Sequence, residues 1–337
     1  MATRVTTIGI TLGDINGIGP EVACLAARQR WPDHLRFVLI GARPLTQRLA
    51  ASFGITDPPA WDPGVRHAPR MRVSLWDPVR HAGSLQREPG HCRVAAARAA
   101  HAWIVAGAKA ALAGRLNALV TAPIQKEGFM KAGLDVPGHT ELLAACCGVR
   151  QVEMMLLADH FRVVLATRHL PVAEVPTALT RRGLQQTIEM TASMLDWLGV
   201  RRRRIAVCGL NPHAGDGGAI GQEERTCIVP AMNRVRRADI QLGGPVPADT
   251  VFHQVVRHHA YDAVIAMYHD QGLAPFKLWA FDRGVNLTGG LPFVRTSPDH
   301  GTAYDLAGRG RADPSSMIAA IKLAAKLAHR PNPWART

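Results

Sequence analysis

Short apolar runs alternate along this chain with longer segments in which apolar residues recur at every third or fourth position. The short runs are typical of strands buried on both faces, and the longer segments are typical of amphipathic helices. The predicted strands span residues 6–12, 37–40, 118–121, 154–157, 163–167, 205–208 and 263–267, and the predicted helices span residues 93–112, 184–198, 223–236, 250–258 and 315–328. This alternation predicts an α/β protein built from βαβ units around a largely parallel sheet.

The length of the chain indicates two domains. At 337 residues it is longer than a single hydrophobic core supports. No Gly- or Ser-rich linker divides the sequence. We therefore expect one domain to be inserted into the other and joined to it by crossing strands.

The composition is that of a folded protein, with 47% hydrophobic and 20% charged residues. No apolar run approaches the roughly 20 residues that a membrane-spanning helix needs, and the first residues lack a signal-peptide pattern. The six cysteines form no C-x-x-C pair and no disulfide framework, which favours buried thiols in a reducing compartment. We expect a cytoplasmic protein that does not act at a membrane.

The formal charge of +14 raises the question of nucleic-acid binding. Of the 40 basic residues only six are Lys, and most of the Arg residues are scattered. The one dense run, 201–204, follows Gly199 at the predicted end of a helix, where positive charge is favourable. Basic and aromatic residues do not interleave as they do in proteins that bind single strands. The pattern therefore argues against a nucleic-acid partner and favours attraction of anionic substrates.

Three of the predicted strands run into turns that each carry a histidine. These are His169 after strand 163–167, His213 after strand 205–208, and His269 after strand 263–267. Ligands of open α/β sheets gather at the carboxyl ends of the strands, so this set looks like a metal site with positions left open for substrate. Among 15 histidines, a single one at a strand end is more often a helix cap or a surface group. The metal interpretation depends on all three together.

Further polar residues stand where packing does not require them. Lys126 follows the strand at 118–121, and His139 and Thr140 stand at a helix start, where Thr140 also fits a plain N-cap. Asn286 and Arg295 belong to the run RGVNLTGGLPFVR. The Gly-rich turn at 13–20 lacks both glycine spacings of phosphate-binding loops, so by itself it is a tight strand-to-helix connection.

Seven motifs make the chain closely resemble the 4-hydroxythreonine-4-phosphate dehydrogenase family of pyridoxal 5′-phosphate biosynthesis. In the family's order they are GDxxGIGPE, TAPIxK, PGHTE, NPHAGDGG, YHDQG, GVNLTGGLPFxRTS and DHGTA, and the resemblance runs from Gly13 to about Ala328. The chain departs from the family pattern at Ile15 and Asn16, where Pro and Ala are usual, and at Gln125 and Gly289. None of these departures removes a ligand, but they leave the subfamily open.

The resemblance implies a fold like that of isocitrate and isopropylmalate dehydrogenases, with two α/β/α domains and an active site in the interdomain cleft. We expect residues 1–130 and 296–337 to form the first domain. Residues 131–295 are expected to form the second and to carry most of the metal and substrate ligands. The resemblance also implies a homodimer with the active site at the subunit interface.

The resemblance also assigns site residues. The family's ligands for a divalent metal match His169, His213 and His269, and its substrate-binding residues match His139, Thr140, Lys277, Asn286 and Arg295. Lys277 and Arg295 would supply charge, and Asn286 a neutral donor, for a phosphate dianion. Zn, Mg and Co all remain open as the metal. Asp249 and Lys126 are the candidates for the proton acceptor, and helix capping with Thr250 is an equal alternative for Asp249.

The implied activity is the NAD(P)-dependent, metal-dependent oxidation of 4-phosphooxy-L-threonine to a 3-keto acid that decarboxylates to 3-amino-2-oxopropyl phosphate. The sequence has no ordinary dinucleotide fingerprint, and NAD and NADP both remain open. Within the family, the alternative substrates are erythronate or threonate 4-phosphate and an aromatic dihydrodiol carboxylate. An acyl-phosphate transferase and a non-enzymatic basic binding protein are further alternatives, and neither of them needs the three histidines.

Overall fold

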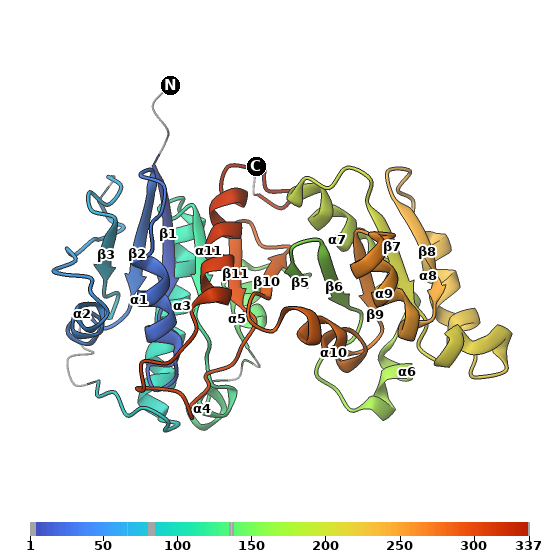
Figure 1. Cartoon of the computed structure of the whole chain (residues 1–337), viewed down its shortest axis with the longest axis horizontal. Coiled ribbons are helices and arrows are strands. Elements are labelled where there is room, and N and C mark those ends of the chain that lie inside the picture. The colour runs from blue at the N-terminus through green and yellow to red at the C-terminus, as the bar shows by residue number, and fades with distance from the viewer. Residues whose placement is uncertain (1–4, 66, 80–84, 135, 137, 336–337) are drawn as a thin grey trace. The chain divides into compact units, whose positions relative to one another are not determined.

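The computed structural model describes residues 5–65, 67–79, 85–134, 136 and 138–335. It divides into two compact units, one formed by Met1–Val152 with Leu291–Thr337 and the other by Glu153–Gly290 (Figure 1). The second unit is thus an insertion in the first. The divisions fall after Val152 and Gly290, whereas we expected them after residues 130 and 295. The difference arises because two helices, α4 (Lys126–Lys131) and α5 (His139–Cys147), pack against α3 (Val94–Leu112). In addition, strand β11 (Val294–Pro298) pairs with β4 (Ala118–Thr121).

The first unit is a parallel sheet with helices packed on it. Its strands follow the order β3-β2-β1-β4-β11, and all four pairings are parallel. The strands are β1 (Thr6–Thr11), β2 (Leu35–Ile40), β3 (Val73–Trp76), β4 (Ala118–Thr121) and β11 (Val294–Pro298), and the helices are α1 (Gly19–Ala27), α2 (Arg43–Ser52), α3 (Val94–Leu112), α4 (Lys126–Lys131), α5 (His139–Cys147) and α11 (Ser315–Leu327). Helix α11 packs on β4 and β11 beside α1, and α3 packs on β1 and β4 beside α4 and α5 (Figure 1).

The second unit has a mixed sheet in the order β10-β5-β6-β9-β7-β8. Strand β5 is antiparallel to both of its neighbours, and the remaining pairings are parallel. The strands are β5 (Glu153–Ala158), β6 (Phe161–Leu165), β7 (Arg204–Cys208), β8 (Gln241–Val246), β9 (Ala263–Ala266) and β10 (Val285–Gly289), and the helical segments are η2 (Val172–Glu174), α6 (Val175–Ala178), α7 (Arg181–Leu198), η3 (Pro212–Gly218), η4 (Glu224–Ile228, a π-helix), α8 (Val229–Arg234), α9 (Ala248–His258) and α10 (His269–Ala280).

Both faces of the second sheet are covered, because its central strands are apolar on both sides. Every residue of β9 is buried. Val264 and Ala266 face a core that α9 and α10 share with β6, and the alternation of side chains turns Ile265 to the other face, on which α7 packs. An apolar run without polar alternation therefore predicted the central strand correctly.

The prediction of an α/β protein is confirmed, and the prediction of a largely parallel sheet holds except around β5. The six cysteines are all free, as predicted. Within the described ranges, none of the helices combines the length and the apolarity that crossing a bilayer requires.

Candidate active site

The three strands that lead to the candidate metal ligands are neighbours in the sheet of the second unit. Strand β9 lies between β6 and β7 and is parallel to both, with Leu165 paired to Ala266 and Val207 paired to Ile265. Parallel neighbours end at the same edge of a sheet, so the turns with His169, His213 and His269 leave the sheet side by side.

Side-chain hydrogen bonds join these strand ends. The Thr167 hydroxyl donates to the Met267 carbonyl at 2.7 Å, which ties the end of β6 to the end of β9. The Gln271 side chain accepts from the Met267 amide at 2.6 Å and donates to the Gly209 carbonyl at 2.8 Å, which ties β9 to the turn after β7. In the sequence, Gln271 stands out only as part of the YHDQG motif, and no local pattern indicates this role.

His169 and His269 lie close enough to act together. Their ring centroids are 5.5 Å apart, with an angle of 45° between the ring planes. The Nδ1 atom of His269 lies 2.6 Å from Oδ1 of Asp270. A carboxylate on Nδ1 leaves Nε2 as the metal-binding atom, which is the usual arrangement around a histidine ligand. These residues therefore fit a divalent ion.

His213 does not join this pair within one chain. Across the residues that the structure describes, no three His, Cys, Asp or Glu side chains gather closely enough to hold a metal ion. His213 is exposed on η3, five residues beyond the end of β7. The three-histidine site thus remains a prediction, with two of its ligands adjacent.

Lys277 and His269 lie on the same helix, α10. The sequence had predicted only a turn at His269, after the strand at 263–267. Eight helical residues separate them by about 12 Å along the axis and by roughly 80° around it. The Lys277 ammonium lies 5.8 Å from the centre of the Phe281 ring. Leu278 and Phe281, which are 91% and 72% exposed, flank this lysine.

Asn286 lies in β10, beside Leu156 of β5. Its amide nitrogen contacts the sulfur of Met154 at 2.8 Å. Its carbonyl oxygen is buried and accepts no hydrogen bond from any described residue. A buried acceptor in this state is costly for structure alone, so Asn286 fits a binding role.

In the first unit, the buried Arg295 and the partly buried His139 lie close enough to influence each other electrostatically. Arg295 is 2% exposed and donates to the Thr121 hydroxyl at 2.8 Å. Burial lowers the pKa of Arg295 to about 10, and Glu141 opposes this shift. Burial also holds the pKa of His139 well below its usual value, and the charge of Arg295 adds to the effect. His139 is therefore a neutral imidazole, and its Nε2 is buried without a hydrogen-bond partner among the described residues.

The residues around His139 decide between capping and binding for Thr140. Helix α5 begins at His139, and its N-cap is Gly138 with no side-chain cap. Thr140 is therefore inside the helix and buried, which removes N-capping as its role. The Lys126 Cε lies 3.8 Å from the point where a Cβ on Gly138 would stand. Pro137 of the PGHTE motif lies outside the described residues.

Asp249, the other candidate for the proton acceptor, is exposed in the first turn of α9. Pro247 is the N-cap of that helix, and no side chain caps it. Asp249 therefore favours the helix through its charge near the N-terminus and not as a cap. The Thr250 hydroxyl donates to the Pro247 carbonyl at 3.3 Å.

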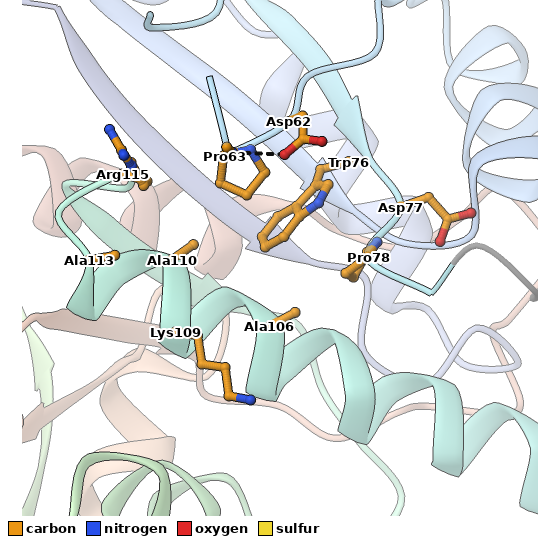
Figure 2. Close-up of a pocket in the computed structure, with 11 residues that line it drawn as sticks. Asp62, Pro63, Trp76, Asp77, Pro78, Ala106, Lys109, Ala110, Ala113 and Arg115 are labelled. Carbon is orange, nitrogen blue, oxygen red and sulfur yellow. Dashed lines mark hydrogen bonds between the residues drawn. The ribbon is translucent and has the colours of Figure 1, made fainter. Parts of the chain in front are cut away.

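A pocket of about 510 Å³ in the first unit involves different residues. Figure 2 shows it between the Trp76 indole and the alanine-lined face of α3. Asp62 accepts from the Gly64 amide at 2.7 Å, and Asp77 accepts from two backbone amides at 2.9 and 3.1 Å. Both carboxylates thus stabilise turns, and all ten predicted site residues lie elsewhere in the described chain.

Comparisons with known proteins give one family. The family model of the pyridoxal phosphate biosynthetic protein PdxA matches residues 35–324. A 4-hydroxythreonine-4-phosphate dehydrogenase of Ruegeria sp. (strain TM1040) is 44% identical over 333 residues, which cover 97% of this chain and 98% of that one. The crystal structure of the enzyme of that name from Klebsiella pneumoniae superimposes with a TM-score of 0.82 at 35% identity and covers 96% of this chain and 100% of that one.

Two more distant structures bear on the alternatives. A terephthalate 1,2-cis-dihydrodiol dehydrogenase from Burkholderia xenovorans LB400 has a TM-score of 0.66 at 29% identity, over 95% of this chain and 98% of that one. A branched-chain phosphotransacylase from Enterococcus faecalis V583 has a TM-score of 0.55 at 11% identity, over 96% of this chain and 100% of that one. The second likeness shows a common fold and no more.

Proposed function

Because the chain belongs to the PdxA family of pyridoxal phosphate biosynthetic proteins, we propose that it oxidises 4-hydroxythreonine 4-phosphate with NAD or NADP and a divalent metal ion. The observation that carries this proposal is the 44% identity with a 4-hydroxythreonine-4-phosphate dehydrogenase over nearly the full length of both chains. The oxidised product is a 3-keto acid that loses carbon dioxide to give 3-amino-2-oxopropyl phosphate.

We assign the metal to His169, His213 and His269. The close approach of the first and last rings and the carboxylate on Nδ1 of His269 support this assignment. A divalent ion held there would acidify the substrate hydroxyl and stabilise negative charge on oxygen. Changing any one of the three to Ala should lower the metal content in elemental analysis and abolish activity, with unchanged circular dichroism. Full activity of thoroughly metal-stripped protein would contradict the assignment.

The substrate phosphate is assigned to Lys277, Asn286 and Arg295, with His139 and Thr140 as further substrate contacts. The unsatisfied Nε2 of His139 supports a substrate contact there, because buried polar atoms in native proteins normally have partners. The Asn286 amide would donate to the phosphate through its nitrogen, whose contact in the structure is the Met154 sulfur, a weak acceptor. A neutral His139 can accept a proton in a hydrogen bond or donate one without adding charge. Two cations and these neutral groups suit a phosphorylated amino acid.

For the proton acceptor, we favour Lys126 over Asp249. Both side chains are exposed, but the Lys126 stem approaches the first turn of α5, which carries His139 and Thr140. Lys126→Met should therefore lower kcat with little change in metal content, whereas Asp249→Asn should retain most of the wild-type rate.

We propose that the enzyme is a homodimer whose sites combine residues of both chains. Helix α10 leaves Leu278, Trp279 and Phe281 exposed in sequence around Lys277, and apolar residues grouped in this way mark an interaction surface. Lys277 lies about 12 Å from His269 along the axis of the helix and about 80° around it. A second copy that packs on α10 would take Lys277 of the first chain into its active site. His169 and His269 of the first chain would act in the first chain's own site.

A dehydrogenase of the same family with a different substrate is the second candidate. The terephthalate dihydrodiol dehydrogenase is similar along the same length of chain, at 29% identity against 35% for the Klebsiella structure. The deciding experiment measures reduction of NAD and NADP with a panel of substrates, each with and without chelator. The panel contains 4-hydroxythreonine 4-phosphate, erythronate and threonate 4-phosphates, and an aromatic dihydrodiol carboxylate. Turnover of the dihydrodiol alone would overturn the proposed substrate.

A further inference from the structure

The turn that carries His213 has an uncommon backbone conformation. From His213 to Gly218 every φ is positive, including 54° at His213, 54° at Ala214 and 43° at Asp216. The left-handed region is unfavourable for residues that carry a Cβ, so a run of this kind persists only where the surroundings hold it.

The Glu224 carboxylate lies directly against this turn. Glu224 is 5% exposed, and its Oε1 accepts from the backbone amides of Leu210 at 2.8 Å and of Asn211 at 2.9 Å. Its Oε2 accepts from the Asn211 side chain at 3.0 Å. One buried carboxylate thus satisfies both amides that precede the left-handed run.

Two glycines allow this close approach. A Cβ on Gly215 would lie 2.6 Å from Oε2 of Glu224, and a Cβ on Gly209 would lie 3.1 Å from Oε1. Gly215 also has a φ of 84°, which disfavours any side chain. The Glu224 carboxylate beneath the turn therefore explains why the NPHAGDGG motif has a glycine at Gly215.

We propose that Glu224 is a positioning residue for His213: its carboxylate fixes the left-handed turn in the conformation that holds the imidazole ready for the metal. This inference rests on the proposed function, since it takes His213 as a metal ligand. Glu224 does not contact the metal itself. Gln271 anchors the same turn from the other side through the Gly209 carbonyl, so the Glu224 and Gln271 side chains together fix its start.

The neighbouring residue provides a matched control. Glu223 stands one position earlier and has the same charge, and it accepts from the Asn211 side chain at 2.8 Å. Its other hydrogen bond comes from the Gln222 amide, outside the left-handed run. Glu223→Gln therefore changes the charge by the same amount without freeing the amides of Leu210 and Asn211.

The test combines Co²⁺ titration of the metal-free dimer, followed in the visible spectrum, with hydrogen–deuterium exchange of the backbone amides. Glu224→Gln should weaken Co²⁺ binding at least tenfold and should speed exchange at Leu210 and Asn211 at least tenfold, while β7 and β9 stay as protected as in the wild type. Glu223→Gln should change both quantities less than threefold. Gly215→Ala disturbs the same contact from the turn side and should weaken Co²⁺ binding even if Glu224→Gln folds poorly.

The outcomes separate the two proposals. Wild-type protein that binds no Co²⁺ would overturn the proposed metal site and, with it, the role of Glu224. Wild-type binding that neither Glu224→Gln nor Gly215→Ala weakens would overturn the positioning role alone. Loss of protection throughout β7 and β9 in Glu224→Gln, together with unchanged Co²⁺ binding by Gly215→Ala, would show a general structural role and would also overturn it.

Discussion

His139 is partly buried, with its Nε2 atom out of reach of solvent, and it lies near the buried guanidinium of Arg295. This placement couples a site residue to protein stability. Burial, and then the charge of Arg295, holds the pKa of His139 well below 6.5 in the folded protein. In the unfolded chain the same imidazole takes up a proton near pH 6.5. The unfolded state therefore binds more protons below that pH, and the stability contribution of this residue is lost as the pH falls below about 6.5.

His139→Gln should reduce this acid sensitivity. Between pH 6.5 and 5, the wild-type unfolding free energy should fall faster than that of the variant, by up to about 1.4 kcal/mol per pH unit. Urea denaturation at pH 7.5, 6.5, 5.75 and 5 provides the measurement. The exposed His67→Gln is the control and should keep the wild-type slope. Equal slopes for wild type and His139→Gln would show that His139 is protonated in the folded protein.

Lys277 tests whether the site selects a phosphate. Loss of one charge-assisted hydrogen bond costs about 1.5–3 kcal/mol, so Lys277→Ala should lower kcat/KM for the phosphorylated substrate by roughly ten- to hundredfold. The metal content should not change. Lys131→Ala, on the exposed face of α4, is the control and should leave kcat/KM unaltered. If the wild-type enzyme oxidised unphosphorylated 4-hydroxythreonine equally well, the phosphate assignment would be wrong.

At the scale of elements, β7 and β9 are also tied together at their amino ends, opposite the edge that carries the candidate metal ligands. Asp262, just before β9, accepts from the Arg204 amide at 2.8 Å and from the Arg204 guanidinium at 3.1 Å through each carboxylate oxygen. Partial burial alone would raise the pKa of Asp262, but the hydrogen bonds from Arg204 outweigh it and lower this pKa below 3.8.

Asp262→Asn should therefore destabilise the protein by about 1.5–3 kcal/mol at pH 7. A carboxyl group with a lowered pKa contributes its stability above its unfolded pKa of about 3.9 and loses it as the pH falls through its folded pKa. The difference between wild type and variant should thus shrink below pH 4, as measured by urea denaturation at pH 7, 5 and 3.5. Asp239→Asn, which removes the ion pairs of a partly exposed carboxylate with Arg237 and Arg203, should cost less than about 1 kcal/mol.

The sequence predicted the strands of this edge because they are buried on both faces and contain no competing polar residue. It missed β3, β8, β10 and β11, whose residues are short runs or mix Gly, Pro and polar side chains, as in QLGGPV and VRTSP. Their strand character comes from pairing with distant segments, which a local pattern does not contain. It also missed α10, because Gly272 and Pro275 suggest a turn.

In the candidate site, too, some features followed from the sequence and others did not. Strand ends brought His169, His213 and His269 to one edge, and this followed from the sequence. The conformation of the His213 turn did not, because it depends on a carboxylate eleven residues later and on glycines whose contacts are visible only in three dimensions. Asn286 and Arg295 came from the family motifs, since nothing in their local pattern separates them from ordinary strand residues.

At the scale of the whole molecule, the proposed second copy rests on the apolar surface that α10 leaves exposed around Lys277. In a two-fold dimer the same surface is used twice, so one interface would complete two sites. Light scattering at assay concentration should show a dimer, and a monomer with full activity would refute the shared site.

Mixing two variants of low activity, assayed at a substrate concentration below KM, gives the sharpest test, if each site takes His213 from one chain and Lys277 from the other. A heterodimer of His213→Ala and Lys277→Ala then has one doubly defective site and one intact site. Random exchange of equal amounts makes about half of the dimers heterodimers, so activity should recover to about 25% of wild type. If both residues of a site belong to the same chain, every site carries one defect and no activity returns.

The reverse mixture must give the opposite result. A wild-type chain paired with a chain that carries both substitutions has a defect in each shared site, so only wild-type homodimers remain active. An equal mixture should then keep about 25% of the activity, against about 50% if each chain completes its own site. Agreement of the two mixtures excludes incomplete exchange as the cause, because incomplete exchange lowers recovery in the first mixture and raises activity in the second. No recovery in the first mixture, together with about 50% activity in the second, would show that the His213 and Lys277 of one site belong to the same chain.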